Sequence, residues 1–96
     1  MNSTGTDRQR LDKWLWHARM ARTRTSAASL VADGHVRING ARVQQPSRPV
    51  RAGDVLTIAL DRDVRLIRVL AFAERRGAFE QAKLLYEDMA PKTDGG

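Results

Sequence analysis

The sequence predicts an α+β fold in which two short helices pack on a small, mostly antiparallel sheet. Three observations point to it. Apolar residues recur at helical spacing near the amino terminus, and alternating apolar residues follow from residue 36. An Asn-Gly pair separates the first two predicted strands. A chain of 96 residues is the size of one small domain. Such a domain buries only roughly 60–65% of the surface of its unfolded chain, so a large catalytic cleft is not expected.

The first helix is expected to begin at Arg10 and to turn one apolar stripe toward the core. The stripe consists of residues at i, i+3, i+4 and i+7: Leu11, Trp14, Leu15 and Ala18. The opposite side of the helix carries four other residues: Lys13, Trp16, His17 and Met20. We therefore expect these four side chains to face away from the core.

A second helix is expected directly after the turn that contains Arg22 and Arg24. Thr23 or Thr25 can accept a hydrogen bond from an unpaired amide at the helix start, and Gly34 is the left-handed residue expected just past its end. The buried face consists of three apolar residues: Ala27, Leu30 and Val31. The two helices should therefore meet near the threonines and place several cations beside a helix N-terminus.

The alternating residues that follow predict a β-hairpin. Val36 and Ile38 share one face of a strand, and Asn39-Gly40 is typical of a tight turn because both positions tolerate positive φ. A return strand is expected to start at residues 42–43.

The rest of the chain predicts a loop, two more strands and a capping element. Residues 44–52 contain two prolines and are expected to be a loop, followed by a strand at residues 55–60. Residues 64–72 are apolar on both sides, which predicts a strand covered on both faces. Residues 78–89 have apolar side chains at helical spacing, which predicts a short helix or turn that caps the sheet.

These patterns divide the chain into four parts. We expect a disordered arm at residues 1–8, a binding domain at residues 9–72, a capping segment at residues 73–90 and a disordered tail at residues 91–96.

The net charge of +6 comes from the first half of the chain. Residues 10–53 contain nine basic and two acidic side chains, whereas residues 54–96 contain seven basic and eight acidic ones. This asymmetry raises the local potential and points to a polyanion: RNA, DNA or an acidic membrane surface. Most of the bases are arginine, which suits bidentate contacts to phosphate, although a genome-wide compositional bias explains the preference equally well.

The sequence offers no catalytic or metal-binding constellation. His17 and His35 fall on different predicted elements, and the chain has no cysteine. Asp61 and Asp63 flank a predicted turn, where carboxylates usually face solvent. The glycines are scattered and form no phosphate-binding loop. We therefore expect no catalytic activity, no metal and no cofactor.

No run of residues approaches the roughly 18 apolar residues that a membrane helix needs. The first residues lack the charged start and apolar stretch of a signal peptide. The absence of cysteine is compatible with a reducing compartment. We expect a cytoplasmic monomer without a membrane partner.

The basic residues of the first half remain as the candidate binding site. A solvated charged surface is the simplest alternative, but so few acids are interleaved that the cations repel one another unless an anion neutralises them. The predicted helix start at residues 23–26 adds unpaired amides where a phosphate can sit. The second helix is short and rich in Ala and Ser, which suits recognition of structured RNA by shape better than the reading of DNA bases.

Trp16 allows two interpretations. It is either buried beneath the carboxy-terminal segment, or exposed beside Lys13 and Met20, where it stacks on a base or docks on a protein partner.

The charged and apolar residues of the first half also resemble a known family. The chain is similar to the RNA-binding domain named after protein four of the small ribosomal subunit and, more narrowly, to the bacterial heat-shock protein fifteen family, over about residues 9–90. The resemblance lies in these residues: Arg10-Leu11-Asp12-Lys13-Trp14-Leu15-Trp16, Arg19, Thr23-Arg24, Gly34, Val36 and Asn39-Gly40.

The resemblance implies an αL-type fold that holds ribosomal RNA on its helical side. For the narrower family it implies a role on the free large ribosomal subunit that still carries a nascent chain on tRNA after translation has failed. The phosphates would be held by the turn from Arg22 to Thr25 together with flanking bases. The implied RNA-binding residues are Arg10, Lys13, Arg22, Thr23, Arg24 and Arg37, with Arg19 and Arg42 as additions. Thr25, at the predicted helix start, completes the set of candidate RNA-binding residues.

Two other functions remain open from the sequence. The domain type also occurs as an accessory module of RNA-modifying enzymes, so the chain could serve a separate catalytic polypeptide. A general nucleic-acid protein that binds DNA is the other alternative. Members of the narrower family continue into a long basic extension, whereas the second half of this chain is neutral to acidic.

Overall fold

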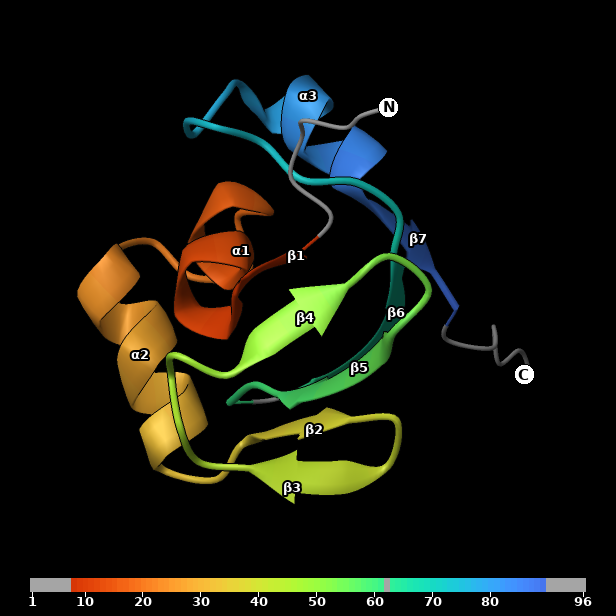
Figure 1. Ribbon diagram of the computed structural model, residues 1–96. Coiled ribbons are helices and arrows are strands. Elements are labelled where there is room, and N and C mark those ends of the chain that lie inside the picture. Colours follow the sequence, from red (N-terminus) through yellow and green to blue (C-terminus); the bar gives the residue numbers. More distant parts are fainter. Residues whose placement is uncertain (1–7, 62, 90–96) are drawn as a thin grey trace.

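The computed structural model of the protein describes residues 8–61 and 63–89 (Figure 1). In chain order the elements are β1 (Arg8–Arg10), α1 (Leu11–His17), α2 (Arg24–Ala32), β2 (Val36–Ile38), β3 (Ala41–Val43), β4 (Pro49–Arg51), β5 (Val55–Ala59), β6 (Val64–Val69), α3 (Phe79–Ala82), the 3-10 helix η1 (Lys83–Leu85) and β7 (Tyr86–Asp88). The tail expected at residues 91–96 lies outside the described residues. So does the arm expected at residues 1–8, except for Arg8, which begins β1.

The strands form two antiparallel sheets, which confirms the α+β class. The larger sheet has the order β3-β2-β5-β6-β7, and β1 pairs with β4. The expected turn joins β2 to β3, with φ of +52° at Asn39 and +87° at Gly40. The Val55 amide donates a hydrogen bond of 3.0 Å to Asn39 Oδ1, so the same residue fixes the hairpin on β5.

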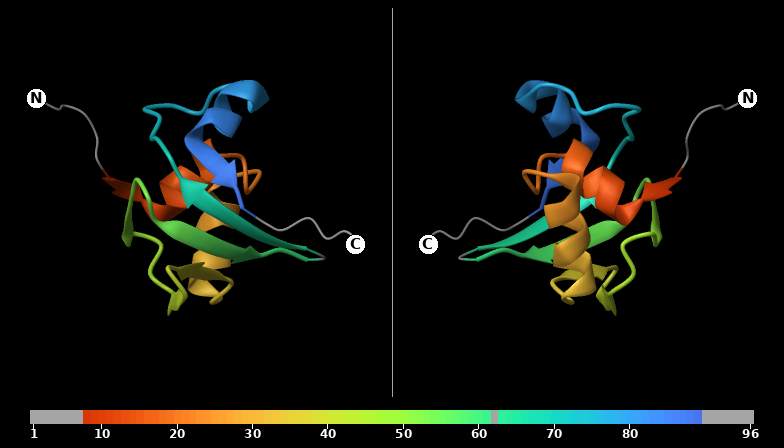
Figure 2. Two further views of the ribbon diagram at one scale, coloured as in Figure 1. Left: turned by 90° about the vertical axis from the view of Figure 1, so that its right-hand side faces the viewer. Right: turned by 90° about the vertical axis from the view of Figure 1, so that its left-hand side faces the viewer.

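The core lies between the α1–α2 pair and the strands (Figures 1 and 2). The predicted stripe of α1 is confirmed, because Leu11, Trp14 and Leu15 are fully buried. Leu56 of β5 and Ile67 of β6 are buried on the sheet side of the same cluster. Burying a Leu or Ile side chain contributes roughly 1.5–3 kcal/mol, so this cluster supplies much of the driving force for folding.

Helix α1 ends sooner than expected, and two side chains predicted to face outward are buried. The Met20 amide donates to Leu15 O at 2.9 Å and the Arg19 amide to Trp16 O at 3.1 Å, while Arg19 adopts a left-handed φ of +62°. This Schellman turn carries Met20 back into the core, where it is 8% exposed. The outward placement of Met20 was therefore wrong, because the helix has already ended when the chain reaches it.

The prediction for His17 was also wrong, because the carboxy-terminal segment covers that side of α1. His17 is 1% exposed, and its imidazole donates a hydrogen bond to the backbone of Ala73. Side-chain hydrogen bonds to backbone oxygens join residues 71–77 to the first half of the chain. Three side chains of the first half donate to this segment: Gln9 to Ala73 at 2.8 Å, Trp14 to Ala71 at 2.9 Å and Arg19 to Gly77 at 2.8 Å. In the other direction, Arg76 donates to Trp16 O at 3.0 Å.

Three of the expected β and capping elements differ from the structure. The loop expected at residues 44–52 contains β4, which pairs with β1 through Gln9 and Val50. Strand β6 is covered on one face only, since Val64 is 56% exposed while Ile67 is buried. The short helix or turn expected at residues 78–89 is present as α3 and η1, but its last part forms β7, where pairing with β6 satisfies the backbone groups.

Candidate nucleic-acid interface

One buried carboxylate organises the cations at the start of the helices. Asp12 on α1 accepts two hydrogen bonds from the Arg10 guanidinium, from Nε at 3.1 Å and from Nη2 at 3.0 Å. Arg24 Nη2, at the start of α2, lies 3.9 Å from Asp12 Oδ1. Both arginine side chains remain about half exposed, so their free donors face solvent beside each other.

The two helix starts differ in their free amides. The Leu11 and Asp12 amides of α1 donate to the backbone oxygens of Arg48 and Pro46. At α2, Thr23 Oγ1 accepts a hydrogen bond of 2.9 Å from the Ser26 amide, as expected for an N-cap. The amides of the first two residues of α2 have no partner among the described residues, and they point out of the helix end where an anion is favoured.

Two pairs of arginines stand directly opposite each other on neighbouring strands. Arg37 faces Arg42 across β2 and β3, and Arg8 faces Arg51 across β1 and β4. Like charges in such cross-strand positions are destabilising unless an anion screens them. All four side chains are exposed, so both pairs are open to a polyanion.

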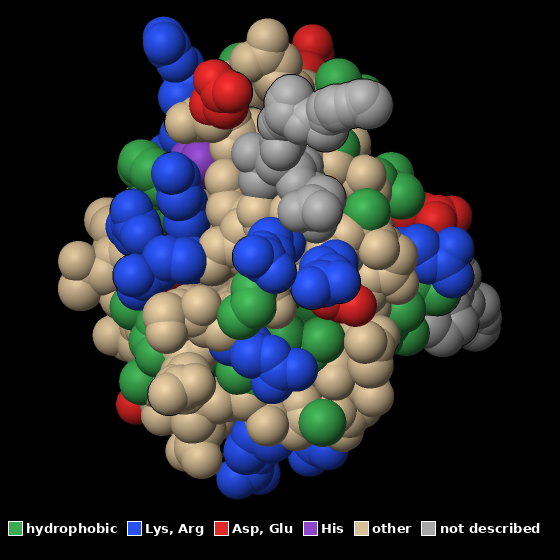
Figure 3. All heavy atoms as spheres, in the orientation of Figure 1, with side chains coloured by type: hydrophobic (Ala, Val, Ile, Leu, Met, Phe, Trp, Pro, Cys, Tyr) green, Lys and Arg blue, Asp and Glu red, His purple; other side chains and the backbone are tan. Residues whose placement is uncertain are grey.

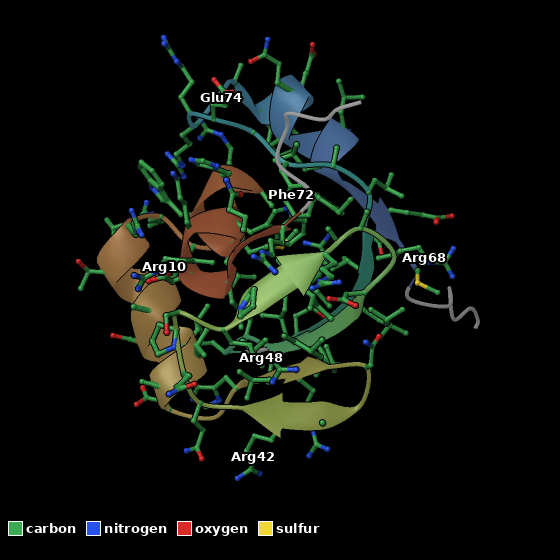
Figure 4. All side chains as sticks on the ribbon, viewed as in Figure 1. Arg10, Arg42, Arg48, Arg68, Phe72 and Glu74 are labelled. Carbon is green, nitrogen blue, oxygen red and sulfur yellow. The ribbon has the colours of Figure 1, made fainter. Side chains whose placement is uncertain are left out.

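The cations gather on one surface of the molecule. We call the surface formed by the α1–α2 turn, the β1–β4 pair and the β2–β3 hairpin the basic face. Figure 3 shows Lys and Arg side chains spread over it with few acids between them, and Figure 4 shows Arg10, Arg48 and Arg42 along it. The basic residues of this face are Arg8, Arg10, Arg22, Arg24, Arg37, Arg42, Arg48 and Arg51.

Most of these cations are not neutralised by the protein. In residues 8–61 and 63–89, Asp12 is the one carboxylate that forms ion pairs with the basic face. The other ion pairs join Arg65 to Asp88 and Arg68 to Glu87 on β6 and β7. The basic face therefore carries a surplus of exposed positive charge.

The predicted site residues divide into two groups. Arg10, Arg22, Thr23, Arg24, Thr25, Arg37 and Arg42 lie on the basic face. Arg19 instead turns toward the carboxy-terminal segment and binds Gly77 O. Lys13 is half-buried on α1, close enough to His17 to lower the pKa of that imidazole.

Sequence reasoning missed three basic-face residues: Arg8, Arg48 and Arg51. Arg8 and Arg51 reach the face through the β1–β4 pair, which the prediction of a loop at residues 44–52 did not include, and Arg48 lies directly before β4. The charge count over residues 10–53 already contained two of them, and it was the signal that could have found them.

Trp16 is half-buried and lies beneath Arg76. The Arg76 guanidinium carbon lies 5.5 Å from the centroid of the Trp16 ring, and the His17 ring lies 5.3 Å from it on the same helix. Arg76, from the carboxy-terminal part of the chain, therefore lies over the half-buried Trp16 ring, and the stacking or partner contact expected for Trp16 stays a prediction.

Burial lowers the pKa of His17 below its usual value of 6.5. The charges of Lys13, Arg24 and Arg76 lower the pKa further, whereas the hydrogen bond to Ala73 raises it. The imidazole is therefore neutral at pH 7 and adds no charge to the basic face.

No helix among the described residues is long and apolar enough to cross a membrane. Within residues 8–61 and 63–89, no three His, Asp or Glu side chains lie where they could share a metal ion.

Comparison with known proteins places this geometry in a family. The S4 domain family matches residues 9–56. The chain is 41% identical over 83 residues to the heat shock protein 15 homolog of Aeromonas salmonicida and 40% identical over 85 residues to heat shock protein 15 of Escherichia coli K12. These matches cover 86% and 88% of this chain, and the chain spans 62% and 63% of the length of those two relatives.

Two further comparisons agree with these. Small ribosomal subunit protein uS4 of Synechococcus is 39% identical over 70 residues, which are 73% of this chain and 34% of that protein. A solved structure of Vibrio cholerae heat shock protein 15, described as trimeric, superposes with a TM-score of 0.80 at 36% identity and covers 86% of this chain and 83% of that one. The chain therefore belongs to the S4 domain family and, within it, to the heat shock protein 15 family.

Proposed function

We propose that this chain is a noncatalytic RNA-binding protein whose basic face binds the phosphates of structured ribosomal RNA. The observation that carries the proposal is the set of exposed arginines around the α2 N-terminus, which only Asp12 neutralises among the described residues. Guanidinium groups and free helix amides are both strong phosphate donors.

The shape of the basic face favours folded RNA over the bases of DNA. Helix α2 has nine residues, and its sequence RTSAASLVA contains no Asn or Gln to read base edges in a major groove. The cations lie on the start of α2 and the turn before it, on a strand pair and on a hairpin, so they suit a phosphate backbone that folds in three dimensions.

The proposed site of action is the large ribosomal subunit that still carries peptidyl-tRNA after aborted translation, in the cytoplasm. The support is the similarity to proteins named heat shock protein 15 and the resemblance described above. The Vibrio cholerae relative is described as trimeric, whereas the sequence of this chain led us to expect a monomer. The monomeric state therefore stays a prediction.

A competition experiment tests the binding proposal. The full chain is titrated with a labelled fragment of large-subunit rRNA, and unlabelled rRNA fragments and duplex DNA compete. We expect rRNA to displace the label at concentrations at least tenfold below those of DNA. Equal competition by DNA would assign the basic face to general nucleic-acid binding.

Sedimentation tests the proposed site of action. Lysates are prepared with and without a treatment that releases large subunits with tRNA attached, and the protein is followed through a sucrose gradient. We expect it to move into the large-subunit fraction after the treatment. Its presence in the small-subunit fraction, or at the top of the gradient in both samples, would contradict the proposal.

A further inference from the structure

A concave site lies next to the basic face, between the α1–α2 turn and α3. It is a pocket of about 280 Å³, which we call the Phe79 pocket. Its walls are formed by Arg19, Met20, Ala21, Arg22, Arg76 and Phe79. Three of these six residues are arginine and none is acidic, so the pocket is strongly positive.

Phe79 gives the pocket an exposed aromatic wall. It is the first residue of α3 and is 60% exposed, whereas Ala82 of the same helix is buried. Lys83 adds a further cation, with Nζ 5.4 Å from the centroid of the Phe79 ring. An exposed aromatic ring among cations is the arrangement that single-stranded nucleic-acid sites use for base stacking.

The structure fixes two of the guanidinium groups without neutralising them. Arg19 donates to Gly77 O from Nε at 3.2 Å and from Nη2 at 2.8 Å. Arg76 donates to Trp16 O at 3.0 Å and to Ala21 O at 3.3 Å. Uncharged carbonyl groups hold both side chains in place, so each keeps its full charge.

The two guanidinium groups repel each other. Burial, and then the charge of Arg19, lower the pKa of Arg76, and neither arginine forms an ion pair with a described carboxylate. Arg19 also keeps its left-handed φ of +62°, a conformation that costs a residue other than glycine free energy. An anion between the two cations would relieve the repulsion.

We propose that the Phe79 pocket holds one unpaired nucleotide of the bound RNA, with its base on the Phe79 ring and its phosphate among Arg19, Arg22 and Arg76. This inference rests on the proposed function and extends it. Arg22 directly precedes Thr23, the N-cap of α2, so a strand leaving the pocket passes straight to the free amides of the basic face. A phosphate alone would leave the aromatic ring unused, and a paired nucleotide would keep its base away from it.

Two RNA hairpins test the proposal. They share one sequence, and one carries a single bulged 2-aminopurine nucleotide. We expect the full chain to bind the bulged hairpin about tenfold more tightly and to quench the 2-aminopurine fluorescence, as stacking on an aromatic side chain does. Phe79→Ala should lose this preference, and Phe79→Trp should keep it.

Leu84→Ala is the matched control, because Leu84 is 70% exposed in the adjoining η1 and does not line the pocket. It should leave the preference unchanged. Arg19→Gly is the second test variant, since glycine accepts the left-handed φ of this position while removing the guanidinium. It should weaken binding of the bulged hairpin more than that of the plain one.

The outcomes separate the two proposals. If the wild-type protein binds neither hairpin, the proposed function fails. If it binds both equally, or if Phe79→Ala and Leu84→Ala behave alike, the proposed function stands and the pocket assignment is overturned. A change in sedimentation coefficient with Phe79→Ala and no change in RNA preference would assign the ring to protein contact instead, which also overturns it.

Discussion

Asp12 shows how a single side chain sets the geometry of the basic face. It is 4% exposed and gathers Arg10, Arg24 and the Lys13 amide around one carboxylate. The two arginines differ in how they are held. Arg10 forms two hydrogen bonds with Asp12, whereas Arg24 approaches it at 3.9 Å without one. Arg24 is therefore free to bind a phosphate at little cost to the fold.

The first prediction concerns Arg24→Ala. Losing a charge-assisted phosphate contact should weaken binding to every RNA ligand by about 1–2 kcal/mol. The thermal midpoint should change little, because Arg24 is half exposed and the buried Asp12 keeps both hydrogen bonds from Arg10. Filter binding and calorimetry measure the two effects. Arg68→Ala is the control, since Arg68 lies on β6 away from the basic face (Figure 4) and pairs with Glu87. Equal losses in both variants would remove Arg24 from the interface.

The second prediction concerns the pH dependence that His17 gives to stability. The folded-state pKa of His17 lies below its unfolded value of 6.5, so the unfolded state binds the proton more readily. Its contribution is complete above about pH 6.5 and is lost as the pH falls through the folded pKa. Urea unfolding at about pH 7.5 and about pH 5.5 should show lower stability at the acidic value.

His17→Gln should flatten this pH dependence, whatever it does to absolute stability. His35→Gln is the matched control because the His35 side chain is exposed. An unchanged slope in the His17 variant would mean that other groups cause the loss of stability in acid.

At the scale of elements, the position of each helix end decides whether it can bind an anion. At the start of α1, the Leu11 and Asp12 amides donate hydrogen bonds to backbone oxygens of the β3–β4 connection. At the start of α2, the Thr23 side chain accepts one hydrogen bond, from the Ser26 amide. Two helices of similar length therefore present different ends to a ligand, and only α2 offers free amides.

The third prediction concerns this cap. Thr23→Ala removes the hydrogen bond to the Ser26 amide and should lower the free energy of unfolding by about 1 kcal/mol, as N-cap truncations do. Thr23→Ser keeps the hydroxyl and should retain most of the stability. Urea denaturation with a constant m-value measures both. Similar losses in the two variants would show that the methyl group of Thr23, not the cap, matters there.

At the scale of the molecule, the charge is divided between two surfaces. The basic face carries unneutralised arginines, whereas the arginines of β6 pair with Asp88 and Glu87 of β7. This division gives the chain an electrical polarity that a net charge of +6 alone does not specify. Association with a polyanion should be steered toward the basic face.

The fourth prediction follows from that polarity. If about six phosphates are neutralised, the logarithm of the binding constant should fall with the logarithm of the salt concentration with a slope of about −4 to −5. Titrations of an rRNA fragment over a series of salt concentrations give the slope. A slope near zero would exclude binding through the basic face.

The local patterns allowed much of the fold and part of the site to be predicted. The stripe of α1, the Thr23 cap, the Gly34 stop and the Asn39-Gly40 turn depend on neighbours within a few residues, and all are confirmed. The first-half charge surplus likewise follows from composition and locates most of the basic face.

Contacts between distant segments decided the rest. Strand β4 exists because β1 pairs with it, and His17 is buried because residues near Ala73 cross α1. Neither partner is near in sequence, so no local periodicity reports it. The sequence by itself determined where α1 and α2 begin, the turn between β2 and β3 and the sign of the charge. Only the tertiary structure decided which arginines share a surface and that Phe79 meets Arg19 and Arg76, because burial and charge density depend on what lies nearby in space.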